Sequence, residues 1–125
     1  MIYIVLNAWP IAVAALSAVG LGALWYRCPV STPTLLTIIA AHLWLGAILA
    51  GALILAPPKG DVWTMTIGSA FIIWIGFVLP ALAASYRLRG LAWRAIAIDA
   101  GYWLAAMLLQ ATLMRMIGLT PPPGG

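Results

Sequence analysis

Four long apolar runs, separated by short polar segments, constrain this chain more than any other feature of its sequence. Only 6% of its 125 residues are charged and 66% are hydrophobic, whereas about a quarter of the residues in a soluble domain are charged. Each run approaches the ~20 residues that a helix needs to cross ~30 Å of hydrocarbon. The sequence therefore predicts an all-α integral membrane protein with the lipid bilayer as its main surroundings.

Proline, glycine and charged residues mark where the four helices end. The predicted spans cover residues 4–26, 33–55, 62–86 and 91–117 of a single domain over residues 1–119, and a Pro/Gly tail follows at 120–125. Pro10 either lies in the first turn of a helix that starts near Ala8 or kinks a longer helix, and Pro80 is expected to bend the third helix. Because the connecting segments are short, consecutive helices should run antiparallel, as an up-down-up-down bundle.

The net charge of +4 fits membrane topology, and nucleic-acid binding is not expected. Basic residues mark the cytoplasmic side of a membrane protein. One side of the predicted bundle carries four arginines, and the other side carries two basic residues. The first group is Arg27, Arg87, Arg89 and Arg94, and the second is Lys59 and Arg115. The sequence thus predicts a multi-pass protein of a bacterial inner membrane with both termini outside.

Small residues recur at spacings of four on the first two predicted helices, where they allow helix backbones to approach closely. They are Ala14, Ala18 and Gly22 on the first helix, and Gly46, Ala47, Ala50 and Gly51 on the second. These seams either hold one bundle together or form a dimer face.

Polar residues at depth in a membrane are functional candidates by default. Asp99 and His42 lie at similar predicted depths, roughly 12–13 Å from the cytoplasmic end at 1.5 Å per residue, so the two side chains could meet and carry a proton. Tyr102 and Trp103 share the helix face of Asp99. Alternatively Asp99 is structural, paired with an arginine or held by Tyr and Trp donors. Near the outer end, Asn7 and Gln110 match in depth and are expected to hydrogen-bond to each other.

Enzymatic and cofactor chemistry find little support in the sequence. It contains no nucleophile-elbow motif, no phosphate-cradling Gly loop and no paired carboxylates, so no catalytic residues, metal or cofactor are expected. His42 lies in Ala40-Ala41-His42-Leu43-Trp44. This segment faintly resembles helices of light-harvesting polypeptides, which leaves bacteriochlorophyll or haem binding through His42 as a weak alternative.

Three segments carry a further resemblance: Gly22-Ala23-Leu24-Trp25-Tyr26, Trp74-Ile75-Gly76-Phe77-Val78-Leu79-Pro80 and Ile98-Asp99-Ala100-Gly101-Tyr102. In order and spacing they resemble the bacterial membrane family catalogued as domain of unknown function 1761. The resemblance implies a four-helix inner-membrane protein and brings no activity. It also implies that Trp25, Tyr26, Gly76, Asp99 and Tyr102 belong to a shared internal framework, with Gly76 as a helix-packing position. The segment between the first two helices is shorter here than is usual in that family.

Three functional hypotheses follow from these observations. The first is a non-enzymatic accessory or assembly subunit of a larger membrane complex, or a homo-oligomer. The second is a small proton-linked transporter or channel that uses Asp99 and His42 as its relay. The third is the pigment or haem protein that would use His42 as its ligand.

Overall fold

A computed structural model of the chain describes residues 2–56 and 60–123, and its regular elements are all helices. They are α1 (Ile2–Leu6), α2 (Ala8–Tyr26), α3 (Thr32–Leu55), α4 (Val62–Ile73), the π-helical turn η1 (Trp74–Val78), α5 (Leu79–Leu88) and α6 (Trp93–Ile117). Helices α4, η1 and α5 form one continuous rod, so four spans are long and apolar enough to cross a membrane. The all-α, four-span prediction is confirmed, and the chain is a multi-pass membrane protein.

Local sequence explains where the helices begin. Asn7 leaves the helical region (φ −113°, ψ 23°) and separates α1 from α2, so Pro10 lies in the first turn of a helix that begins at Ala8, where no N–H is needed. Ser31 caps α3 by accepting a hydrogen bond from the Thr34 N–H, and Asp61 caps α4 in the same way through the Thr64 N–H. The predicted turn at Lys59 lies outside the described residues.

The rod formed by α4, η1 and α5 accommodates Pro80 next to the π-helical turn. A proline four residues after Gly76 cannot donate to the Gly76 carbonyl. One turn earlier the hydrogen-bond register changes, and the Leu79 N–H donates to the Trp74 carbonyl five residues back. The span therefore widens locally at Trp74–Val78, one π-helical turn before Pro80. The bend that the sequence predicts at Pro80 stays a prediction.

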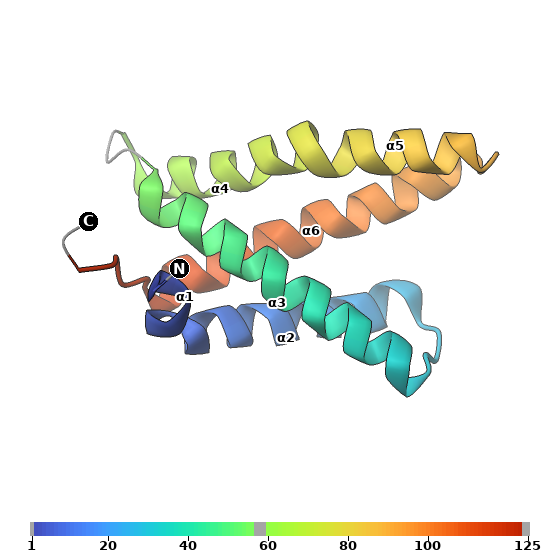
Figure 1. Ribbon diagram of the computed structural model, residues 1–125. Helices are drawn as coiled ribbons and strands as arrows, with labels where there is room; N and C mark the ends of the chain where they lie inside the picture. The colour runs from blue at the N-terminus through green and yellow to red at the C-terminus, as the bar shows by residue number, and fades with distance from the viewer. Residues whose placement is uncertain (1, 57–59, 124–125) are drawn as a thin grey trace.

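Helix α6 is the centre of the bundle (Figure 1). It packs against α2, α3, α4, η1 and α5, whereas α2 packs against α3 and α6. Helix α3 crosses in front of α6 and reaches α4 near one end of the bundle. The rod of α4 and α5 therefore lies almost entirely against α6, and only Thr66 and Ala70 are buried along it.

The predicted small-residue seams form contacts within this one chain. Ala14, Ala18 and Ala47 are buried in the core, and a Cβ at Gly46 would come within 3.4 Å of the Gln110 amide. Two further glycines admit tyrosine rings: a Cβ at Gly22 would lie 3.0 Å from the Tyr102 hydroxyl, and one at Gly51 would lie 2.9 Å from the Tyr3 hydroxyl.

Gly76 is different from these glycines. It is exposed, and a Cβ there would meet nothing within 4 Å. The expectation that Gly76 packs inside the bundle is therefore wrong, because the rod turns this face of η1 away from α6.

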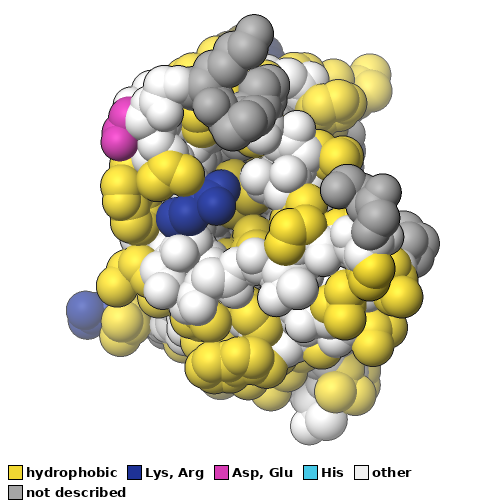
Figure 2. Space-filling view, turned by 90° about the vertical axis from the view of Figure 1, so that its left-hand side faces the viewer, with side chains coloured by type: hydrophobic (Ala, Val, Ile, Leu, Met, Phe, Trp, Pro, Cys, Tyr) yellow, Lys and Arg dark blue, Asp and Glu magenta, His cyan; other side chains and the backbone are white. Residues whose placement is uncertain are grey.

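At the end of the bundle that holds the two termini, hydrophobic side chains alternate with other side chains and backbone, and a basic and an acidic side chain are visible (Figure 2). The helix ends with Arg27, Arg87, Arg89 and Arg94 lie at the other end, at the connections from α2 to α3 and from α5 to α6. We call this the arginine end.

Candidate functional site

A group of polar side chains inside the spans lies toward the arginine end, and Asp99 is the acidic member of this group. Asp99 lies on α6, one and a half turns from its start. The Tyr26 hydroxyl at the end of α2 donates to Asp99 Oδ1 at 2.7 Å, and the Tyr86 hydroxyl of α5 donates to Oδ2 at 2.6 Å. One carboxylate thus joins three helices. The sequence left either an arginine or Tyr and Trp donors as the partners of Asp99. Both hydrogen bonds come from tyrosines.

His42 forms a second arrangement deeper in the bundle. It is buried on α3, its Nδ1 lies 2.7 Å from the Ile38 carbonyl oxygen, and its Nε2 lies 2.6 Å from the Tyr102 hydroxyl. The same hydroxyl lies 2.9 Å from the carbonyl oxygen of Ala18 on α2. His42 and Tyr102 therefore connect α2, α3 and α6 through a line of three close polar contacts.

The line has more polar contacts than hydrogens to place in them. Both ends are carbonyl oxygens, which only accept. A neutral imidazole carries one N–H and a tyrosine one O–H, so two hydrogens serve three contacts. If Nδ1 carries the hydrogen, it donates to the Ile38 carbonyl, and Nε2 and the Ala18 carbonyl compete for the Tyr102 hydrogen. If Nε2 carries the hydrogen, it donates to the Tyr102 hydroxyl, which donates to the Ala18 carbonyl. A protonated imidazole would supply a hydrogen to each of the three contacts. Both carbonyls also accept backbone N–H groups within their own helices.

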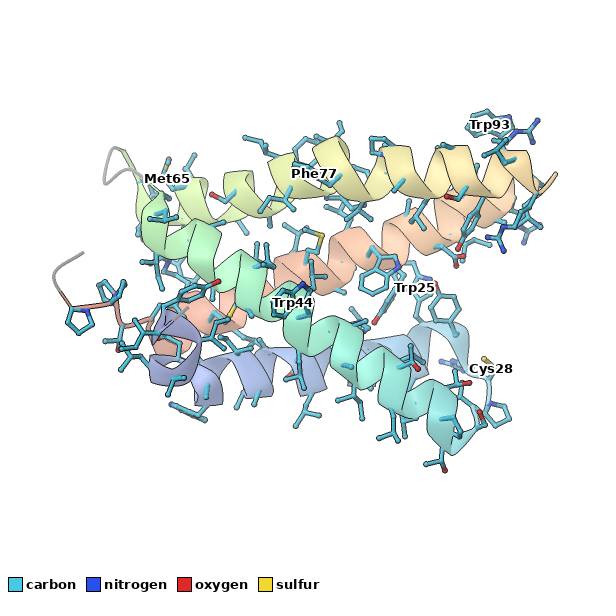
Figure 3. The ribbon with its side chains drawn as sticks, viewed as in Figure 1. Trp25, Cys28, Trp44, Met65, Phe77 and Trp93 are labelled. Carbon is cyan, nitrogen blue, oxygen red and sulfur yellow. The ribbon has the colours of Figure 1, made fainter. Side chains whose placement is uncertain are left out.

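Aromatic rings enclose the line. The Trp103 ring stacks on His42 at 4.8 Å between centroids, and Trp25 and Tyr26 approach the Tyr102 ring edge-on at 6.0 and 5.3 Å. Figure 3 shows Trp25 among the side chains between α2 and α6. Rings in these geometries hold their neighbours in one orientation, so the position of the Tyr102 hydroxyl is fixed from several sides.

The structure brings the predicted pair of Asp99 and His42 into one cluster without a hydrogen bond between them in the described part of the chain. Tyr26 binds Asp99 and its ring touches Tyr102, which binds His42. Tyr102 and Trp103 do belong to the cluster, as their shared helix face with Asp99 indicates.

The predicted hydrogen bond between Asn7 and Gln110 is replaced by other partners. The Asn7 amide donates to the Tyr3 and Thr120 carbonyls, and its Oδ1 accepts from the Thr120 N–H at 2.6 Å. Gln110 donates to the His42 carbonyl at 3.0 Å, and its Oε1 is buried without a partner among the described residues. Asn7 thus anchors the segment after α6, while Gln110 stays deeper in the core than a simple count of residues along straight helices predicts.

A cavity of about 330 Å³ opens beside His42 and Tyr102. Helices α2, α3 and α6 and the connection from α2 to α3 form its walls. They contribute hydrophobic side chains together with Tyr26, His42, Tyr102 and Trp103, and Cys28 lies near its outer part. Figure 3 places Cys28 in that connection.

The family resemblance implied an internal place for Tyr26 but no partner, and the sequence predicted no role for Tyr86 or Tyr3. Tyrosines near helix ends suit the membrane interface, and this general preference hid their hydrogen bonds to Asp99 and, for Tyr3, to the Ala47 carbonyl. An intramembrane acid without a basic residue one turn away is the signal that could have directed attention to these hydroxyls.

The donor groups within the described residues are poorly arranged for a metal or a haem. No three of the His, Cys, Asp and Glu side chains there cluster in a way that could hold a metal ion. Both ring nitrogens of His42 already face hydrogen-bond partners. An iron or magnesium at Nε2 would have to displace Tyr102.

Comparison with known proteins returned no match: no family model, no curated protein and no solved structure is similar to this chain. The resemblance to the family of unknown function thus stays a prediction.

Proposed function

We propose that this protein is a non-enzymatic subunit of a membrane assembly, and that the rod formed by α4, η1 and α5 supplies its interface. The observation that carries the proposal is how little of this rod the chain itself covers. Only 6% of the most apolar window in this span is buried, against 28%, 33% and 39% in the other three spans. Helices in lipid associate by close packing, and this rod packs mainly on α6, with α3 touching it only near one end of α4.

The exposed face of the rod is suited to another helix. A Cβ at Gly68 or Gly76 would meet nothing within 4 Å, and small residues of this kind let a second helix approach closely. Large side chains surround them on the same rod: Trp63, Ile67, Phe71, Ile72, Ile75 and Phe77 are all exposed. The π-helical turn at Trp74–Val78 also lies here, and such turns occur frequently at functional sites.

The location that we propose is a bacterial inner membrane with the arginine end in the cytoplasm. Arg27 and Arg94 flank the first and last spans at this end, and basic residues are enriched on the cytoplasmic side of membrane proteins. Both termini would then lie outside. Labelling of a cysteine placed in the tail by a membrane-impermeant reagent tests this orientation.

The assembly proposal is tested with two leucine substitutions. Gly76→Leu adds a side chain on the exposed face of the rod, and Gly20→Leu adds one on the exposed side of α2; a Cβ at either position meets nothing within 4 Å. The tagged protein is extracted in mild detergent and its partners are identified by native mass spectrometry. We expect the wild type and Gly20→Leu to retain a stoichiometric partner or second copy, and Gly76→Leu to lose it. A monodisperse monomer from native membranes would contradict the proposal.

The second candidate is the proton-linked transporter, which two observations favour. Asp99 lies inside a span, and the line through His42 and Tyr102 can accept one more hydrogen. Against it, the core toward the other end is packed with apolar side chains such as Leu49, Met107 and Met114. Proton flux into liposomes distinguishes the two functions, because Asp99→Asn should abolish flux only if Asp99 is part of a relay.

A further inference from the structure

We propose that the rod binds a second copy of this chain, and that the Trp44 indole N–H of one copy donates a hydrogen bond to the backbone carbonyls around Gly76 of the other. The inference rests on the proposed assembly function, because it names the partner that the exposed face of the rod binds. It follows from acceptors and a donor that lie at the same depth in the spans and have too few partners within the described residues.

The acceptors are the carbonyls of residues 75–77, which outnumber their backbone donors. The Leu79 N–H donates to the Trp74 carbonyl, and Pro80 has no N–H. The N–H groups after Ala81 return to the regular pattern of α5, in which each donates four residues back. The Ala81 N–H is therefore the one backbone donor left for three carbonyls, and no side chain of the described residues donates to them.

These carbonyls lie where water cannot replace the missing donors. Gly76 is twelve residues from Leu88 at the arginine end of the span, about 18 Å at 1.5 Å per residue, and thus near the middle of ~30 Å of hydrocarbon. All three residues are exposed, and a Cβ at Gly76 would meet nothing within 4 Å. Because an unsatisfied backbone group is costly in lipid, this stretch requires a donor from another molecule.

Trp44 offers a donor at the same depth. It lies twelve residues from Thr32 at the arginine end of α3, which again is about 18 Å. Figure 3 shows Trp44 near the middle of α3 and Phe77 near the middle of the rod. Trp44 is 59% exposed, although tryptophans prefer the membrane interface. The Trp74 indole N–H donates to the Ala100 carbonyl at 2.8 Å, whereas that of Trp44 has no acceptor in the described part of the chain.

A second copy satisfies both groups with one contact. Copies that follow the same distribution of basic residues have the same orientation in the membrane, so equal depth within one chain is equal depth between two chains. The lack of a side chain at Gly76 lets the indole approach the backbone. A two-fold dimer forms the contact twice, and a ring forms it once at each interface. A different protein would have to offer a donor to the rod and an acceptor to α3 independently.

Self-association is tested by energy transfer between two pools of purified protein in mild detergent, with donor or acceptor fluorophores on a C-terminal tag. Trp44→Phe removes the N–H and keeps a ring. Trp9→Phe is the matched control, because Trp9 is similarly exposed on α2. We expect Trp44→Phe to raise the dissociation constant roughly threefold to tenfold for each contact, the loss of one net hydrogen bond, and Trp9→Phe to leave it unchanged. Pro80→Ala returns an N–H to the rod, so Trp44→Phe should have little further effect in that variant.

Crosslinking between copies locates the contact. One helical turn toward the termini, the exposed Ile48 on α3 corresponds in depth to the exposed Ile72 on the rod. In a Cys28→Ser background, copies with Ile48→Cys and copies with Ile72→Cys should form a mixed disulfide on oxidation. Ile48→Cys should form none with Leu88→Cys, because the two positions differ in depth by more than a disulfide can span.

The possible outcomes separate this inference from the assembly proposal. Self-association that Trp44→Phe leaves unchanged would overturn the inference, and so would the absence of a disulfide between positions 48 and 72. A stoichiometric complex with a different protein and without a second copy would also overturn it, while supporting the assembly proposal. A monomer from native membranes would refute both.

Discussion

Two glycines on α2, two residues apart, should respond in opposite directions to the same added methyl group. Gly20 is exposed and a Cβ there meets nothing within 4 Å, whereas a Cβ at Gly22 lies 3.0 Å from the Tyr102 hydroxyl oxygen and 3.3 Å from Cζ of the same ring. Tyr102 cannot easily retreat, because its hydroxyl is held by the Ala18 carbonyl at 2.9 Å and by His42 at 2.6 Å. Gly22→Ala therefore crowds a fixed ring.

The magnitudes follow from two opposing effects. Replacing a helical glycine with alanine gains about 0.5–1 kcal/mol of helix stability, and overpacking a well-packed core costs about 1–3 kcal/mol. Gly20→Ala should thus raise the free energy of unfolding by up to about 1 kcal/mol. Gly22→Ala should lower it by about 1 kcal/mol, so the two variants should differ by about 2 kcal/mol.

The assay is reversible unfolding by SDS added to protein in mild detergent, followed by tryptophan fluorescence and far-ultraviolet circular dichroism. Coincident transitions from the two probes justify a two-state analysis. In the double variant Gly22→Ala with Tyr102→Phe, the closest contact is gone, so its destabilisation should be smaller than the sum of the two single changes. If Gly22→Ala is as stable as Gly20→Ala, the close approach of α2 and α6 described above is incorrect.

The remaining predictions concern the polar contacts between helices and the ends of the chain. Asp99→Ala should lower the free energy of unfolding by about 1–3 kcal/mol, because it removes the hydrogen bonds from two tyrosine hydroxyls. After it Tyr86→Phe should have little further effect, and additive losses in a double-mutant cycle would refute the shared bond. Arg27→Gly should raise the free energy of unfolding by up to about 1–2 kcal/mol, because Arg27 adopts a left-handed backbone conformation with φ 51° that is unfavourable for a residue with a side chain. An unchanged or lower melting temperature would contradict this. Asn7→Ala should release Thr120 and speed proteolysis after α6 without changing the melting temperature of the bundle by more than a few degrees; equal cleavage rates would show that Asn7 does not anchor this segment.

Several parts of the fold follow from the sequence because they depend on local chemistry. The four spans are determined by the length of apolar runs, since backbone polar groups must be satisfied within each helix in lipid. For Pro10 the geometry of proline left two alternatives, and the structure selects the helix that starts at Ala8. The predicted spans 33–55 and 62–86 differ from the helices Thr32–Leu55 and Val62–Leu88 by two residues or fewer at each end.

The partners of the buried polar groups could not be read from the sequence in the same way. Asp99 and His42 are at similar predicted depths, but depth gives no information on how each helix is rotated about its axis. In the structure this rotation places Tyr26 and Tyr86 at Asp99, and Tyr102 at His42. The pairing of Asn7 with Gln110 failed for the same reason, because Asn7 faces Thr120 beyond the end of α6.

The sequence by itself thus determined that this is a four-span membrane protein, where its helices begin and end, and which few polar side chains lie at depth. Only the tertiary structure decided that α6 is central, that Gly76 faces outward and that a cavity borders the polar contacts of His42 and Tyr102. Local composition acts along one helix at a time. The rotation and crossing of helices depend instead on how side chains from several of them fit together, as the ring of Tyr102 fits against Gly22.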